Sequence, residues 1–326
     1  MKLIDRKRIF FIDLIIIVII ITIIRIVFFI RIDNYPSLVD FTPFLNNNNL
    51  IKTEAQFKIN ENLPKIEAAS AFYPFTANLV QTIYNKDSYK NDMVKMVSTS
   101  QTFQDLINGE ADIIIVTNPS DEQKKLIEES KVNLMYITLF QEPLAIILNK
   151  ENPIDNMTIE QIKSIYYNSK SNWNNFSGMN HIVNAYQLEK NNGSQTCFEN
   201  IVKNNNLNKY HHEIKLMPDI IDKVGKDKSA IAYTFYSYYS KMHKNKNVKV
   251  IDVDNQNINL ESYPLLFNVY LIYRADNSNK NIKEIVNWIS SDEGQRIIDL
   301  IKEGRYSYEK KYYKNTIFKC STSYYF

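Results

Sequence analysis

Two stretches of the sequence have the composition of a helix start that binds a small anion. Residues 186–198 (YQLEKNNGSQTCF) are polar and contain glycine up to Ser194, after which apolar residues recur at helical spacing. Residues 68–75 (AASAFYPF) likewise place small residues and a hydroxyl before an apolar helical run. A helix start carries free N–H groups and a partial positive charge. We therefore expect the two stretches to face each other across a cleft and to share one small ligand.

The glycine pattern excludes the common nucleotide-binding and serine-hydrolase loops. The six glycines are too widely spaced for a GxGxxG, GxxxxGK or GxSxG motif. Hydrolysis of a phosphate ester normally needs a metal cluster or an activated nucleophile, and the sequence has the pattern of neither. His211 and His212 lack a third ligand at metal-binding spacing and are expected to be a surface pair. We expect no catalytic residue, no metal and no cofactor.

The net charge of +3 lies entirely in the first 33 residues, which hold six basic and three acidic side chains. The remaining residues hold 33 of each sign, so nothing indicates bulk attraction to nucleic acid. Cys197 and Cys320 are the only cysteines and could be two free or buried thiols or one disulfide. Two cysteines are too few for a cysteine-rich metal site.

Residues 9–30 (IFFIDLIIIVIIITIIRIVFFI) predict a single transmembrane helix, because 22 helical residues reach about 33 Å. The uncharged part, 14–24, has the length of a signal-peptide core, which is the competing interpretation. No small-x-small cleavage site and no lipobox cysteine follows, so we favour an uncleaved anchor. Basic residues within 1–8 would keep the N-terminus in the cytoplasm and place the rest of the chain outside the cell membrane.

The remainder of the chain predicts a linker followed by an α/β fold. Residues 31–61 are polar and asparagine-rich, with Pro36 and Pro43, and are typical of a linker or irregular stalk. Strands and helices then alternate, which favours an α/β fold with ligand loops at the carboxyl ends of the strands. The expected strands are 65–68, 93–97, 112–116, 144–148, 182–186, 230–233, 248–253 and 269–274. The expected helices include 78–84, 102–108, 121–130, 158–166, 219–224, 282–288 and 293–302.

From about residue 63 to 308 the chain resembles the PstS-like phosphate-binding branch of the periplasmic-binding-protein superfamily. The resemblance is carried by several short sequence blocks, none of which is specific to the family alone, although their order and spacing together are. Residues 66–74 (IEAASAFYP) resemble an I-D-G-S-T-A-x-Y-P loop, and 111–120 (ADIIIVTNPS) resemble the A-D-I strand with its loop. Further similar blocks are N-K-E-N-P at 149–153, the helix at 157–166, N-W at 172–173, I-A-Y-T-F at 231–235, Y-P at 263–264 and S-D-E-G-Q at 291–295.

The resemblance implies two α/β lobes joined by a two-strand hinge, with the ligand trapped between them. Lobe I would comprise 62–142 and 262–310, lobe II 143–261, and the C-terminal tail 311–326. The implied function is that of a membrane-anchored, extracytoplasmic solute-binding protein. It would be a monomeric receptor that carries a small oxyanion such as phosphate to the permease subunits of an ABC importer. The implied ligand-binding residues are Ser70, Ala71, Phe72, Ser100, Thr102, Thr117, Asn118, Asn192, Gly193, Ser194 and Gln195.

The chain departs from the family pattern at the anion site. A Y-Q-R-x-x-x-S-G-S-Q-T pattern appears with Leu188 in place of the arginine and Asn192 in place of the first serine, and Ala69 lacks a hydroxyl. Charge-assisted bonds to phosphate are worth roughly 1.5–3 kcal/mol each, so losing a bidentate arginine weakens binding by about two orders of magnitude or more. Lys190 could compensate only as a point charge. The alternative function is therefore a sensor or surface scaffold that kept the fold and lost phosphate binding.

Several residues also have an ordinary structural interpretation. Ser70, Ser194 and Thr196 could be ligand hydroxyls or helix caps, and for Ser100 and Thr102 capping is favoured. Glu142 is expected to be structural, and Trp173 is expected to fill the core. The tyrosine-rich tail could contact a membrane or cell wall, but a solvated or packed end is the default expectation.

Overall fold

The computed structural model describes residues 38–168, 170–203 and 212–306. The predicted cytoplasmic segment 1–8, the anchor 9–30 and the tail 311–326 lie outside the described residues, as do His211 and Cys320. Within the described part, no helix has the length and apolar character needed to span a bilayer.

One mixed sheet of nine strands runs through the molecule, in the order β2-β1-β3-β11-β4-β8-β6-β7, with β9 also paired to β4. Lobe I holds the parallel strands β1 (Ile66–Ala69), β2 (Val94–Val97) and β3 (Ile113–Val116). Lobe II holds β6 (Asn184–Leu188), β7 (His212–Ile214), β8 (Ala230–Phe235) and β9 (Val248–Val250). A separate pair joins β5 (Asn156–Met157) to β10 (Asp252–Val253).

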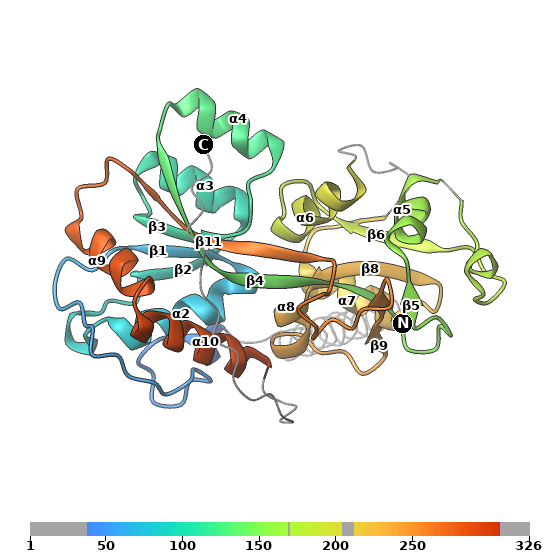
Figure 1. Ribbon diagram of the computed structural model, residues 1–326, viewed down its shortest axis with the longest axis horizontal. Coiled ribbons are helices and arrows are strands. Elements are labelled where there is room, and N and C mark those ends of the chain that lie inside the picture. The colour runs from blue at the N-terminus through green and yellow to red at the C-terminus, as the bar shows by residue number, and fades with distance from the viewer. Residues whose placement is uncertain (1–37, 169, 204–211, 307–326) are drawn as a thin grey trace, which may run out of the picture.

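Two long strands connect the lobes. β4 (Leu134–Asn149) pairs antiparallel with β11 (Leu266–Arg274) up to Pro143, and from Leu144 onward it pairs with β8. A single strand therefore belongs to the sheet of both lobes, and Figure 1 shows it crossing between them. This arrangement supports the predicted two-lobed α/β fold.

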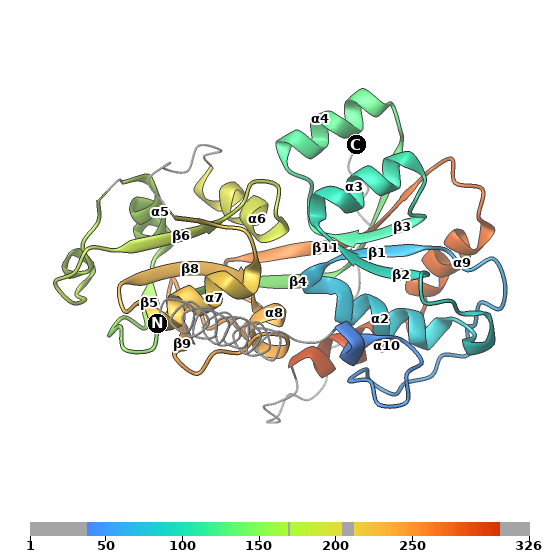
Figure 2. The same ribbon diagram turned by 180° about the vertical axis from the view of Figure 1, so that it is seen from behind.

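Helices cover both faces of the sheet in each lobe (Figures 1 and 2). In lobe I, α3 (Thr99–Asn108) and α4 (Asp121–Ser130) lie on one face, with α2 (Tyr73–Ile83), α9 (Lys280–Ile289) and α10 (Asp292–Tyr306) on the other side. In lobe II, α5 (Ile159–Tyr167) and α6 (Gly193–Val202) lie opposite α7 (Met217–Lys226) and α8 (Tyr236–Lys241). Short 3-10 turns occur at η1 (Leu38–Phe41), η2 (Ser70–Phe72), η3 (Lys86–Ser88) and η4 (Trp173–Phe176).

The hydrophobic core is built around strands that are apolar on both faces. Every residue of β1, β3 and β8 is buried, as expected for strands covered by helices on both sides. Trp173 is fully buried and its indole N–H donates to the Ser229 carbonyl at 2.9 Å, so the predicted core role is confirmed. Capping boxes at Ser120 and Thr158 fix the starts of α4 and α5.

Residues 38–61 differ from the predicted linker, because their apolar side chains pack against lobe I. Phe41, Leu50 and Ile59 are buried. The Ile51 N–H donates to the Asn78 side chain at 2.7 Å. Scattered apolar residues within a polar, asparagine-rich stretch thus add an irregular layer to the lobe.

Candidate functional site

The predicted ligand loops of lobe I lie at one edge of its sheet. η2 follows β1, α3 follows β2, and Thr117 with Asn118 follows β3. Because these strands are parallel, their carboxyl ends meet at the same edge. The N-terminus of α6, which follows β6 in lobe II, lies against this edge.

The start of α6 contacts lobe I directly. The Gly193 N–H donates to Thr99 Oγ1 at 3.2 Å. A Cβ atom added to Gly193 would lie 3.2 Å from Thr117 Oγ1 and 3.3 Å from Thr99 Oγ1, so a larger residue would push the lobes apart. The structure therefore brings the predicted residues Thr117 and Gly193 together, and Gly193 contacts Thr99 as well.

Thr117 is the most informative residue at this contact. Its side chain is 1% exposed, and its hydroxyl has no nitrogen or oxygen hydrogen-bond partner among the described residues. The polar group that it contacts is the Cys197 thiol of α6, whose pKa burial raises to about 12 and the Thr117 contact lowers slightly. A thiol is a weak hydrogen-bond partner, so a ligand oxygen would bond this buried hydroxyl more strongly.

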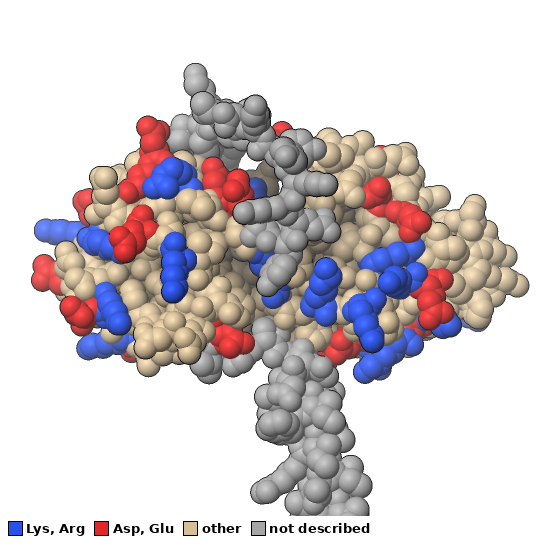
Figure 3. Space-filling model, turned by 90° about the horizontal axis from the view of Figure 1, so that it is seen from below, with Lys and Arg blue, Asp and Glu red and all other residues tan. Residues whose placement is uncertain are grey.

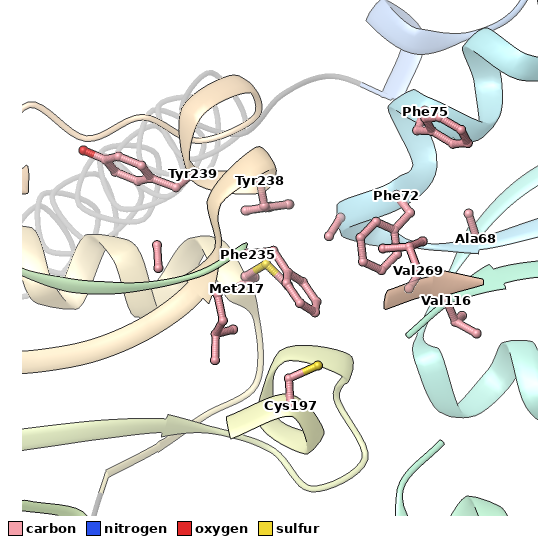
Figure 4. Packing of buried hydrophobic residues seen from close by; sticks show 14 of the residues in the cluster. Ala68, Phe72, Phe75, Val116, Cys197, Met217, Phe235, Tyr238, Tyr239 and Val269 are labelled. Atoms are coloured by element: carbon pink, nitrogen blue, oxygen red, sulfur yellow. The ribbon is translucent and has the colours of Figure 1, made fainter. Parts of the chain in front are cut away.

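The surface of the site next to the Thr99 and Thr117 hydroxyls is apolar. The rings of Phe72 from lobe I and Phe235 from lobe II are 5.1 Å apart. Figure 4 shows the two rings projecting toward each other from their lobes, with Cys197 projecting from α6 nearby. Glu142 is buried in the hinge strand β4 and accepts a hydrogen bond from the Ser237 N–H at 2.7 Å, a contact that fits its predicted structural role.

Other predicted site residues bond within their own lobe. Asn192 caps α6, because its side-chain oxygen accepts hydrogen bonds from both the Ser194 N–H and the Ser194 hydroxyl at 3.0 Å. The Gln195 side chain accepts a hydrogen bond from the Leu188 N–H at 3.0 Å and donates to Glu199 at 2.9 Å.

On lobe I, the Thr102 hydroxyl donates to the Thr99 carbonyl at 2.7 Å. Ser100 lies 3.5 Å from Gln123 Nε2, Ser70 is half-buried and Asn118 is exposed. Ala71 is buried next to a cavity of about 40 Å³ that Ser237 and Lys241 of α8 also line.

No lysine or arginine is buried among the residues whose side chains the structure describes, in 38–168, 170–203 and 212–304. Leu188, at the position where the family pattern has arginine, is 1% exposed at the end of β6. The Lys190 ammonium lies 2.8 Å from the Glu122 carboxylate, and this ion pair raises the pKa of Lys190. Figure 3 shows basic and acidic side chains mixed over one face of both lobes.

Sequence reasoning missed Thr99, Asn191 and Glu122. Thr99 is the first residue of α3 after its cap Ser98, and a predicted helix start three residues earlier than 102 would have included it. Asn191 and Glu122 form contacts between the lobes that depend on how the lobes fit together, and no local pattern marks them.

Comparisons with known proteins agree with this architecture. The model of the PBP superfamily domain matches residues 60–293. A proposed phosphate ABC transporter substrate-binding protein with bound phosphate from Clostridium perfringens has a similar structure, at 20% identity and TM-score 0.57, covering 75% of this chain and 97% of that one. An ABC-type phosphate transport receptor from Vibrio cholerae has 18% identity and TM-score 0.54, covering 75% and 98% of the two chains.

A third similar structure, a hydrogen-peroxide-bound cysteine-to-serine mutant of OxyR from Corynebacterium glutamicum, has 9% identity and TM-score 0.52, covering 80% of this chain and 71% of that one. At these identities the similar structures support the fold alone. The family model covers well over half of the sequence, from just before β1 to the start of α10. The chain therefore belongs to the PBP superfamily.

Proposed function

We propose that this protein is an extracytoplasmic solute-binding receptor of a phosphate-type ABC importer, which traps a small oxyanion between its two lobes. The observation that carries the proposal is the meeting of the α6 N-terminus with the buried Thr117 hydroxyl of lobe I, whose polar contact in the described part of the chain is only the weakly bonding Cys197 thiol. Backbone N–H groups at a helix start and an available hydroxyl are suitable donors for a phosphate oxygen.

In this proposal each lobe contributes donors to one ligand. Lobe I would offer the Ser70 hydroxyl, the Ala71 and Phe72 amides, and the Thr99 and Thr117 hydroxyls. Lobe II would offer the amides at the start of α6, where Asn192 holds the first turn in place. Entry of the ligand would replace the direct bond from the Gly193 N–H to Thr99. Bending within β4 and β11 would open and close the lobes, and the closed form would dock on the permease subunits.

The location is proposed from the sequence. Residues 9–30 would anchor the protein in the cell membrane as a single-pass helix, with the lobes on the extracytoplasmic side. Residues 31–37 would then lead to the packed segment that starts at Leu38. The similar phosphate-receptor structures are consistent with this placement at the level of fold.

A second candidate function is a sensor or surface scaffold that no longer carries phosphate. Buried Leu188 and the lack of a buried cation among the described residues favour it, because a dianion would have only amides and hydroxyls as donors. Direct contact between Phe72 and Phe235 also lets the lobes pack together without a ligand between these rings.

Calorimetric titration of the full-length protein in detergent, with phosphate, arsenate and sulfate, separates these functions. The receptor proposal expects saturable heat with phosphate, with an affinity at least about a hundredfold below that of an arginine-containing site. No heat with any of the three anions would refute it and leave the sensor or scaffold function.

A further inference from the structure

A group of polar side chains joins α4 of lobe I to the loop before α6 of lobe II. We call this group the interlobe latch, and its members are Ser120, Glu122, Gln123, Lys190 and Asn191. Figures 1 and 2 show α4 and α6 on the same side of the sheet, facing each other from the two lobes.

Asn191 is the centre of the latch. Its side-chain oxygen lies 2.6 Å from the Ser120 hydroxyl, and its side-chain nitrogen donates to the Glu122 carboxylate at 2.7 Å. Its main-chain carbonyl accepts a hydrogen bond from Gln123 Nε2 at 3.2 Å. Three polar groups of one residue in lobe II therefore bond to three residues of lobe I.

The local backbone of both partners is suited to this contact. Asn191 has φ 65°, in the left-handed region that asparagine tolerates better than most residues. On the other side, Ser120 and Gln123 form the capping box of α4, in which each side chain bonds the backbone N–H of the other residue. The lobe I half of the latch is thus held by the start of its own helix.

The latch is directly connected to the ligand site. Asn191 precedes Asn192, which caps α6, and Gly193, whose N–H bonds to Thr99. Fixing Asn191 against α4 therefore also fixes the first turn of α6 against Thr99 and Thr117. The latch residues stand outside the proposed set of ligand donors.

We propose that Asn191 is a positioning residue that holds the two lobes closed and thereby sets how fast a trapped ligand is released. This inference relies on the proposed function only in taking lobe closure as the ligand-trapping motion. The Glu122–Lys190 ion pair has side chains about 60% exposed and contributes little by itself. Within the latch, the hydrogen bonds of Asn191 make the larger contribution to closure.

Cys197 provides a natural reporter of lobe opening. Its thiol is buried beside Thr117 of the opposite lobe, and this burial keeps it protonated and shielded. Separation of the lobes would expose it to solvent. When opening and closing are faster than modification, the rate of reaction with a thiol reagent follows the population of the open form.

The test compares Asn191→Gly with Asn255→Gly in full-length protein carrying Cys320→Ser. Asn255 is an exposed lobe II residue that also has a left-handed backbone, at φ 60°, so its replacement is a matched control. Glycine keeps the backbone of Asn191 and removes both side-chain bonds. Because the bond to Glu122 is exposed and the bond to Ser120 is only part-buried, both should be weaker than usual, and we expect Cys197 to react with 5,5′-dithiobis(2-nitrobenzoate) about tenfold faster in Asn191→Gly, with no change in Asn255→Gly.

A second variant, Glu122→Gln, removes the charge from the lobe I side and should accelerate the reaction by about threefold. Equal circular dichroism spectra and melting temperatures would show that the variants remain folded. Unchanged Cys197 reactivity in both folded variants would overturn the proposal. If Cys197 reactivity increases but phosphate gives no calorimetric heat with the wild type, the latch is supported and the proposed function fails. If phosphate does bind, its dissociation should be about tenfold faster from Asn191→Gly than from the wild type.

Discussion

Glu67 provides a quantitative test of the packing of lobe I. It lies in the buried strand β1 with a side chain 4% exposed, next to Asp105 of α3, which is 7% exposed. The pKa of Glu67 is raised to about 7, chiefly because burial removes the carboxylate from water and next because of a hydrogen bond to Asp105. Its Oε2 atom has no hydrogen-bond partner in the described part of the chain.

The raised pKa has a definite consequence for stability. Below about pH 4.5 Glu67 is protonated in both the folded and the unfolded state. Between pH 4.5 and about 7 only the folded state keeps the proton, so the free energy of unfolding falls as the pH rises. The difference between 7 and 4.5 is 2.5 pKa units, and at 1.36 kcal/mol per unit this group destabilises the fold by about 3 kcal/mol above pH 7.

Glu67→Gln removes the titration and keeps the shape of the side chain. We expect the variant to match the wild type within about 1 kcal/mol at pH 5 and to be more stable by about 2–3 kcal/mol at pH 8. Urea unfolding followed by circular dichroism at several pH values between 5 and 8 measures this difference. Contributions from other titrating groups cancel when the two proteins are compared at each pH.

Glu110→Gln is the matched control, because Glu110 is an exposed carboxylate of the same lobe that only slightly raises the pKa of Glu67. It should change the free energy of unfolding by less than about 0.5 kcal/mol at every pH. A difference between Glu67→Gln and wild type that does not vary with pH would refute the reasoning. It would mean that the pKa of Glu67 in the folded protein stays near its ordinary value of 4.5.

Three further substitutions test the site and its supports. Thr117→Val should lower the affinity for phosphate about tenfold in calorimetry and change the melting temperature little, because it removes a buried hydroxyl whose described polar contact is only a thiol; unchanged affinity would remove Thr117 from the site. Thr158→Ala should lower the free energy of unfolding by about 1 kcal/mol in urea titrations, since it breaks the capping box of α5. Phe235→Ala should cost about 3–5 kcal/mol in the same titrations, and a loss below about 1 kcal/mol would contradict its place in the core.

The sequence predicted the elements best where local chemistry determines them. The helix predicted at 121–130 has the bounds of α4, because Ser120 caps it and no tertiary contact is needed to locate its start. In contrast, α2 begins at Tyr73, five residues before the predicted start. Pro74 lies in its first turn, where a helix tolerates proline, although the residue was treated as part of a loop.

The long hinge strand was predicted only in part. Residues 144–148 are apolar and buried on both faces, and this half of β4 was expected. The half from Leu134 to Pro143 contains exposed residues and a proline, so it lacks the continuous apolar pattern. Its strand conformation is stabilised by pairing with β11, which lies more than a hundred residues away in the sequence. Such pairing is not visible in a local window.

The site could be predicted as two helix starts but not as a set of contacts. The residues of η2, Thr117 and Gly193 lie at the expected edge because strand direction places them there. Ser194 and Gln195 instead bond within lobe II, since the first turn of a helix needs partners for its own polar groups. The pairing of Gly193 with Thr99 depends on the relative position of the two lobes, which no local sequence pattern determines.

The absence of a buried cation among the described residues changes how an anion would have to be held. A guanidinium would bind through direct charge, whereas the start of α6 offers about half a unit of positive charge and a few amides. Binding would then depend more strongly on excluding water and on keeping both lobes in place around the ligand. The ring contact of Phe72 with Phe235 and the hydrogen bonds of Asn191 would serve those two requirements without a side-chain donor to the ligand. On this reasoning, substitutions that open the lobes should weaken binding as much as substitutions of the donors themselves.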